Sequence, residues 1–316
     1  MPRLAPLFPF VLLGVSRSAL AHVASNIASS SADRAEVLLV CALILFAAVL
    51  YIAGLLRIRT YVVRGRREIV SRMVAFAAGV AVLTVALLSP LDRWSAELFS
   101  MHMVQHELLM LGAAPLLVIG RPLPVWLWAF GAAGRGTIGR IVRPRGVRGV
   151  WSALLSPGLA WSCHALALWV WHVPKFFDAV LVSRPLHDLQ HVTFLATALM
   201  FWTALLEERN RERRGAGILY LFTTTVHTSV LGALITFAAH PWYSTYLQMP
   251  VHWGLSALED QQLGGLIMWV PGSMVYVGMA LLLLARWIGS SDAPRPQESR
   301  VRSGANAHRL PGRVPR

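Results

Sequence analysis

The chain has 316 residues, of which 56% are hydrophobic and only 14% are charged, and its mean hydropathy is positive at +0.56. A soluble domain carries about 25% charged residues, so this composition excludes an ordinary water-exposed surface. The net charge of +14 does not indicate nucleic-acid binding, because the arginines lie between apolar runs and do not form one basic face.

The first 21 residues have the features of a signal peptide. Arg3 precedes an apolar stretch, and a small-residue cleavage sequence ends at Ala21. An uncleaved additional span is the alternative. Cleavage would leave His22 at the start of a polar outer segment, residues 22–35, where its amine and imidazole could together chelate Cu(II).

Seven apolar runs follow, each long enough to cross the hydrocarbon core, which takes about 20 residues of helix. None shows the alternation of a barrel strand, and backbone groups in lipid must be satisfied internally, so the runs predict helices. The sequence therefore predicts an all-α membrane bundle of about seven spans over residues 36–287. The predicted spans are Glu36–Leu56, Met73–Ser89, Met101–Ile119, Pro157–Val173, His187–Leu206, Gly217–Ala239 and Leu263–Trp287.

The arginines predict the orientation of this bundle. Nearly all of them fall in residues 57–72, 121–148, 209–214 and 286–316, which lie on one side of the seven spans. Because basic residues favour cytoplasmic loops, we expect the N-terminus outside and the C-terminus inside, with the chain a multi-pass protein of the cytoplasmic membrane. The Pro-, Ser- and Arg-rich tail, residues 288–316, is predicted to be disordered.

Histidines gather on the side that the arginines avoid. The pairs His102/His106 and His187/His191 open two helices, and His172 closes another. Residues four apart share one helix face and can present two imidazoles to one ion. We therefore predict a metal site formed by His102, His106, His172, His187 and His191. A belt of interfacial histidines bonded to water and lipid head groups is the alternative interpretation.

Nearby side chains favour copper for this site. Met101, Met103 and Met249 lie at the same level, and imidazole with thioether suits copper, including Cu(I). Polar neighbours that could orient the imidazoles, or accept bonds from them, are Gln105, Glu107, Asp188, Gln190, Glu259 and Asp260. For the two carboxylates at the mouth of the last helix, a role at the helix N-terminus is equally open.

Two further histidines, His164 and His227, fall deeper within predicted spans beside several threonines. They predict either a relay or lower metal site, or hydrogen bonds that hold helices together. Cys41 and Cys163 lie in apolar runs without a CxxC pair, so we expect buried thiols and no disulfide.

The ordered motifs of residues 36 to 287 resemble those of a known family. They are His102-Met103-Val104-Gln105-His106, Ala114-Pro115-Leu116-Leu117, Trp171-His172-Val173-Pro174, the second histidine pair, Leu258-Glu259-Asp260-Gln261-Gln262 and Met268-Trp269-Val270-Pro271-Gly272. Together they resemble the multi-spanning CtaG family of cytochrome c oxidase assembly factors. The resemblance implies a protein that matures a haem–copper oxidase, with copper as its inferred cargo and with oxidase subunits, membrane lipid and a copper chaperone as partners.

The histidines and the missing enzyme motifs also allow other function classes. No Walker A loop, GxSxG or HExxH motif occurs, so no enzyme is predicted. Two histidines on neighbouring helices could instead ligate haem in a membrane b-type cytochrome. A copper transporter, with His164 and His227 along its path, is the other alternative.

Overall fold

The computed structural model describes residues 31–59, 66–206, 214–247 and 254–291. Within these ranges the chain is helical and contains no strand, which confirms the all-α prediction. The predicted signal peptide and His22, together with Met249 and most of the predicted basic tail, lie outside the described residues.

Six spans are long and apolar enough to cross a membrane unaided. They are α3 (Ser31–Ile58), α4 (Arg66–Leu88), the run of α6 (Phe99–Glu107), η1 (Leu108–Ala113) and α7 (Ala114–Gly120), α13 (Arg184–Leu206), α14 (Arg214–Thr236) and α16 (Ala257–Ser291). The chain is thus a multi-pass membrane protein, as its composition predicts.

A bent pair of helices makes a seventh span if the two are counted as one. The predicted span Pro157–Val173 corresponds to α11 (Pro157–Trp171), whose 15 residues reach only about 22 Å. A hydrocarbon core of about 30 Å needs more, and the preceding α10 (Arg145–Leu154) supplies it at an angle of 59°. Pro157 starts α11 and lacks the N–H needed to continue α10, which explains the break. The predicted helix is therefore confirmed as α11, and the structure adds a bend and a second helix before it.

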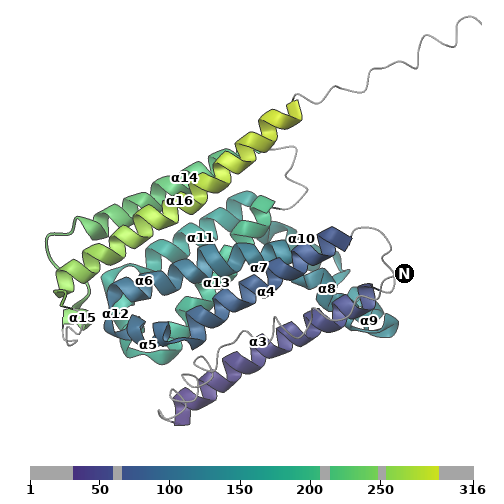
Figure 1. Ribbon diagram of the computed structural model, residues 1–316, viewed down its shortest axis with the longest axis horizontal. Coiled ribbons are helices and arrows are strands. Elements are labelled where there is room, and N and C mark those ends of the chain that lie inside the picture. Colours follow the sequence, from purple (N-terminus) through teal and green to yellow (C-terminus); the bar gives the residue numbers. More distant parts are fainter. Residues whose placement is uncertain (1–30, 60–65, 207–213, 248–253, 292–316) are drawn as a thin grey trace, which may run out of the picture.

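Short helices cover both ends of the bundle (Figure 1). One end carries α5 (Pro90–Glu97), α12 (Pro174–Val182) and α15 (Ser244–Leu247), and the other carries α8 (Pro122–Ala129) and α9 (Ala132–Val142). We call them the histidine end and the arginine end. Helices α5, α8 and α12 each begin at a proline, whose missing N–H costs nothing in the first turn. The arginine-rich segment 121–148, expected as a loop, is mostly helical.

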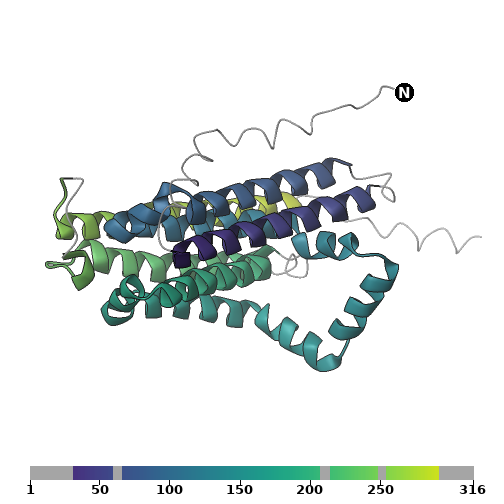
Figure 2. The same cartoon turned by 90° about the horizontal axis from the view of Figure 1, so that it is seen from below.

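Close helix contacts depend on glycine. The long helix α16 lies beside α14 along most of its length and crosses α6 (Figures 1 and 2). A Cβ atom at Gly265 would lie 2.6 Å from the Thr236 backbone nitrogen, and one at Gly232 would lie 2.9 Å from Trp269. Small residues therefore let these two helices approach within the membrane, as is typical of transmembrane packing.

The third span contains a π-helical turn, η1. The backbone N–H of Ala114 donates to the carbonyl of Leu109, five residues back, where an α-helix would bond four back. Within this turn the Met110 carbonyl accepts from the indole N–H of Trp202 on α13, at 2.9 Å. That indole satisfies a backbone oxygen inside the membrane, where no water replaces a missing partner.

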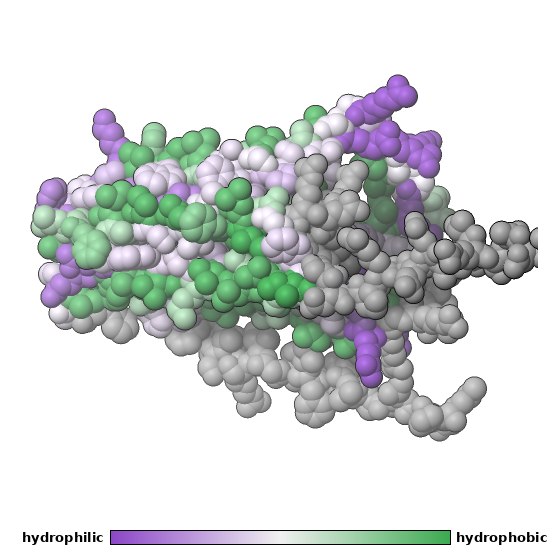
Figure 3. Space-filling view, turned by 90° about the horizontal axis from the view of Figure 1, so that it is seen from above, coloured by the Kyte–Doolittle hydropathy of each residue, from purple (hydrophilic) through white to green (hydrophobic). Residues whose placement is uncertain are grey.

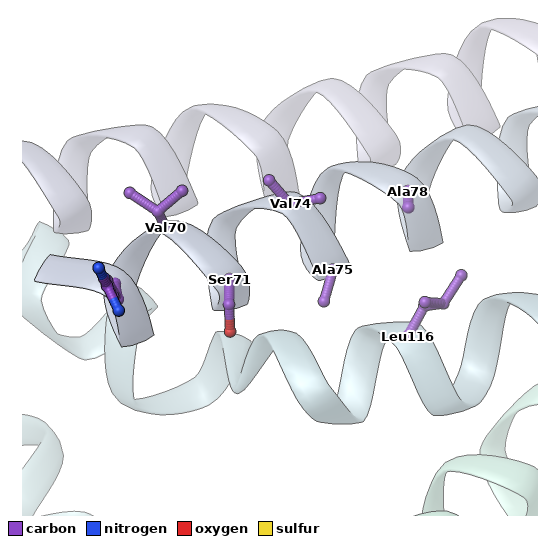
Figure 4. A pocket seen from close by; sticks show the side chains of 7 residues that line it. Val70, Ser71, Val74, Ala75, Ala78 and Leu116 are labelled. Atoms are coloured by element: carbon purple, nitrogen blue, oxygen red, sulfur yellow. The ribbon is translucent and has the colours of Figure 1, made fainter.

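The hydropathy of the surface also differs between the middle of the bundle and its two ends. Hydrophobic side chains form a broad band around the middle of the bundle, and hydrophilic ones gather at its two ends (Figure 3). A groove of about 650 Å³ lies between α4 and α7, near the arginine end (Figure 4). Its lining is mostly aliphatic, from Val70 and Val74 on the exposed side to Leu116, and it includes none of the predicted metal ligands.

Candidate metal centre

Three histidines from two spans meet at the histidine end. His102 and His106 lie one turn apart on α6, and His191 lies on the facing side of α13. One ring nitrogen from each lies within 4.8 Å of the others, and all three side chains are buried. The ring centroids are 4.4 Å apart for His102 and His106, and 5.6 Å apart for His106 and His191. We call these three residues the histidine triad.

Ring nitrogens in this triad are left without hydrogen bonds. Both nitrogens of His106 and Nε2 of His191 are buried and have no hydrogen-bond partner among the described residues. A buried polar group without a partner costs about 1–3 kcal/mol. A metal ion would use those lone pairs, and bonds of about 2.0 Å would draw the nitrogens to about 3.3 Å from one another.

His102 is oriented by hydrogen bonds. Its Nδ1 lies 3.3 Å from the Ser95 carbonyl and 3.2 Å from the Tyr246 hydroxyl. Because a carbonyl only accepts, we place the proton on Nδ1, and Nε2 then carries a lone pair that can only accept. The end of the Gln190 amide that lies 3.3 Å from Nε2 must therefore be its NH2 group, reached by a flip of the amide, for the two to bond. Burial raises the pKa of Tyr246 well above its ordinary value, so its hydroxyl remains protonated and donates to the Ser95 carbonyl at 2.7 Å.

The other two predicted ligands flank the triad. His172 caps the end of α11, where its Nδ1 donates to the Leu168 carbonyl at 2.6 Å and its buried Nε2 lacks a hydrogen-bond partner within the described ranges. Its ring lies 6.2 Å from that of His106. His187 is only partly buried, with its ring 4.2 Å from His191 and 5.5 Å from His102. All five predicted residues therefore meet in one cluster, with the triad as its compact part.

An acidic residue distant in sequence holds the first histidine helix. Asp260 of α16 accepts hydrogen bonds from the backbone N–H groups of Phe99, at 2.6 Å, and Ser100, at 3.1 Å. The residue before α6, Leu98, has no side chain that could cap it. Asp260 therefore serves as the N-cap of α6 from another helix, and its charge complements the helix dipole. This differs from both predicted roles, because Asp260 is buried, its bonds go to Phe99 and Ser100 within the described structure, and the helix that it caps is α6 and not its own.

Glu259 acts locally. Its Oε2 accepts from the Ser256 backbone N–H at 2.7 Å, while the Ser256 hydroxyl accepts from the Glu259 N–H at 3.3 Å. This reciprocal pair is a capping box at the start of α16. Glu259 is thus a helix-capping residue, and its hydrogen bonds within the described ranges go to Ser256 and not to a histidine.

An aromatic cluster covers the triad beside α15. Phe99, Phe177, Tyr243 and Tyr246 pack together, and the rings of Phe99 and Tyr243 stack 4.7 Å apart. The Tyr243 hydroxyl donates to the His172 carbonyl at 3.2 Å. This cluster excludes water and lipid from one side of the site. Sequence reasoning missed Tyr246, because α15 precedes a loop and carries no histidine pattern.

The polar neighbours predicted to orient the ligands divide into two groups. Gln190 contacts His102, whereas Gln105 donates to the Ala86 carbonyl at 2.8 Å and to Asp92 at 2.9 Å. Glu107 points away from the triad toward Gly272 of α16, where a Cβ atom would lie 3.0 Å from its Oε2. Met103 packs within the aromatic cluster.

The deeper histidines do not join the triad. His164 is buried, with Nδ1 3.3 Å from the Thr197 hydroxyl and Nε2 3.4 Å from the Tyr276 hydroxyl. The His227 ring lies 5.3 Å from Trp161, and both of its nitrogens lack partners in the described part of the chain. His164 thus fits the predicted role in holding helices together. Cys41 and Cys163 are free and half-buried, as expected.

Comparisons with known proteins place this arrangement in context. The chain is 26% identical over 249 residues to an uncharacterised protein of Mycobacterium leprae, covering 75% of this chain and 37% of that protein. It is 25% identical over 271 residues to uncharacterised proteins of Mycobacterium bovis and Mycobacterium tuberculosis, covering 82% of this chain and 39% of each. The chain therefore spans less than two fifths of the length of these relatives. No solved structure matches.

The family comparison covers nearly the whole helical bundle apart from most of α3. A family model described as cytochrome c oxidase caa3 assembly factor (Caa3_CtaG) matches residues 49–290, which include both histidine pairs, His172 and the helix that carries Asp260. The match extends over more than half of the chain, and it agrees with the motifs on which the resemblance rests. The chain belongs to the Caa3_CtaG family of cytochrome c oxidase caa3 assembly factors.

Proposed function

We propose that this protein binds copper at the histidine end and assists its delivery to cytochrome c oxidase in the cytoplasmic membrane. His102, His106 and His191 hold the ion, and His172 and His187 lie close enough to contribute. The protein acts by binding and transfer, not by catalysis. Its partners are oxidase subunits, membrane lipid and a copper chaperone.

The observation that supports this proposal is the set of unpartnered nitrogens in the triad. Three imidazole nitrogens lie within 4.8 Å of one another, and His106 has neither nitrogen bonded within the described structure. Neutral imidazoles suit copper, and the buried, aromatic-lined setting favours a site that releases its ion to a protein partner and not to water.

The geometry favours an ion over haem. The axial imidazoles of a bis-histidine haem lie on opposite faces of a macrocycle. His106 and His191 face each other from neighbouring helices with ring centroids 5.6 Å apart, and the buried Phe194 ring packs 4.6 Å from that of His106, so a macrocycle could enter between them only by displacing buried side chains. A transport path through the deeper histidines is also less favoured, because both nitrogens of His164 are hydrogen-bonded.

The test compares the wild-type chain, a double variant and a control variant. Each is purified, and each is also expressed in a strain that lacks the protein. The double variant His102→Ala with His106→Ala should insert normally, lose bound copper and fail to restore oxidase activity. His240→Ala is the matched control, because this histidine is exposed and follows α14 at the same end. Copper content by elemental analysis and oxidase activity in membranes are the measurements. Full oxidase activity in the double variant, at normal protein level, would refute the proposal.

A further inference from the structure

The five clustered histidines differ in exposure and in what they contact. His102, His106 and His172 are at most 3% exposed, whereas His187 is only partly buried at the outer start of α13. His187 also lies outside the set of three whose nitrogens already converge. Its position is therefore that of a residue between solvent and the triad.

His191 belongs to both groups. It shares a helix face with His187, with ring centroids 4.2 Å apart, and it lies 5.6 Å from His106 across the helix contact. An ion held by His187 and His191 would therefore reach the triad by releasing His187 and binding His102 and His106. Its remaining ligand, His191, would stay bound throughout.

Charges around His187 favour the approach of a cation. Asp92 and Glu36 lie within electrostatic range of His187, as does Arg184. The Arg184 guanidinium is bound by both carboxylate oxygens of Glu36, at 2.6 and 3.0 Å, so its positive charge is offset. Asp92 is half-buried, and its negative charge also acts on His187. The Gln105 amide holds this carboxylate in place by a hydrogen bond of 2.9 Å. Carboxylates lining an opening raise the local concentration of cations.

We propose that His187 and His191 form a loading site that receives copper at the outer mouth and passes it to the histidine triad. This inference rests on the proposed function, because it assumes that the triad is the final site. His187 is then a transfer ligand that speeds uptake and adds little to the final affinity. The ion changes ligands one at a time, without a change in oxidation state.

The experiment separates rate from affinity in the full chain in detergent. Cu(I), supplied as a complex with a coloured competing chelator, is mixed with the apo-protein, and chelator absorbance gives both the transfer rate and the equilibrium constant. His187→Ala should slow transfer at least 10-fold while changing the affinity less than about 3-fold. His106→Ala should lower the affinity by about 100-fold, as expected for a lost ligand.

Charge is tested with a matched pair of variants. Asp92→Asn retains an oxygen that can accept from Gln105, and it should slow transfer several-fold and weaken the dependence of the rate on salt concentration. Glu68→Gln, on α4 at the arginine end, should leave the rate unchanged.

Two outcomes would overturn the loading site. If His187→Ala lowers the affinity as much as His106→Ala, His187 is a permanent ligand. If it alters neither rate nor affinity, His187 takes no part in uptake. A wild-type chain that takes no Cu(I) from the chelator would overturn the proposed function together with this inference.

Discussion

Two buried histidines in this bundle, one in the triad and one deeper in the membrane, differ in how their ring nitrogens are satisfied. His106 in the triad has both nitrogens without a partner among the described residues, although it is 1% exposed. His164 is equally buried, but each of its nitrogens faces a hydroxyl group, from Thr197 or Tyr276. Burial alone therefore does not identify a ligand site. Free lone pairs and convergence are both needed, because His227 also has two nitrogens without a partner in the described part of the chain but lies outside the set of three whose nitrogens converge.

The largest expected effect tests that contrast directly. His191→Ala should lower copper affinity by about 100-fold or more, since it removes a ligand, whereas His164→Ala should leave the affinity unchanged. His164→Ala should instead lower the free energy of unfolding by about 1–3 kcal/mol, because the Tyr276 hydroxyl loses its partner. Copper titration and thermal unfolding in detergent measure the two quantities. Equal losses of affinity in both variants would remove the distinction between the triad and the deeper histidine.

A second, smaller effect tests what positions the triad. Asp260→Ala should lower the free energy of unfolding by about 2 kcal/mol, because it removes the cap of α6, and it should also weaken copper binding through His102. Asp260→Asn keeps one acceptor oxygen and should cost less on both counts. Thermal unfolding of the apo-protein and copper titration provide the comparison. Unchanged copper affinity in Asp260→Ala would show that α6 holds its histidines without this cap.

The smallest effect is expected one residue earlier. Glu259 is fully exposed and closes a capping box at the start of α16, so Glu259→Gln, which keeps an acceptor oxygen, should leave the free energy of unfolding nearly unchanged. Copper affinity should not change. A loss comparable to that of Asp260→Ala, in the same unfolding and titration experiments, would contradict the separate roles given to these adjacent acids.

The sequence predicts local features of this molecule well. Seven spans follow from segment hydropathy, and the pairing of His102 with His106 follows from helical periodicity, because both depend on neighbours within a few residues. The meeting of α6 and α13 needed only the assumption that helices opening on one side lie close together.

Contacts between distant segments were beyond such reasoning. Asp260 caps a helix about 160 residues earlier, and periodicity carries no information about that partner. The bend before Pro157 was visible in principle, because the residue preceding a proline disfavours helix. The Tyr246 contact with His102 depends on how a loop folds back, which hydropathy does not encode.

The π-turn of the third span has a consequence for the rotation of two helices about their axes. After the Ala114 bond to Leu109, the next bond of the same kind would run from residue 115 to Met110. Residue 115 is proline and has no N–H to give, so the Met110 carbonyl would lack its donor. The indole of Trp202 supplies that donor.

This bond links the rotation of α6 and α13 about their axes to the geometry of the metal site. Met110 lies one turn beyond His106, and Trp202 lies about three turns beyond His191, at 3.6 residues per turn, on the corresponding face of α13. The rotation of the two helices about their axes is thus fixed at two depths. The indole–carbonyl bond fixes it deeper in the membrane, and the facing imidazoles fix it at the histidine end. Turning either helix by one residue, about 100°, would break the deeper bond and part the facing rings together. Pro115 leaves the Met110 carbonyl without a backbone donor, and Trp202 supplies one. This bond thereby keeps the imidazoles of α6 and α13 facing each other.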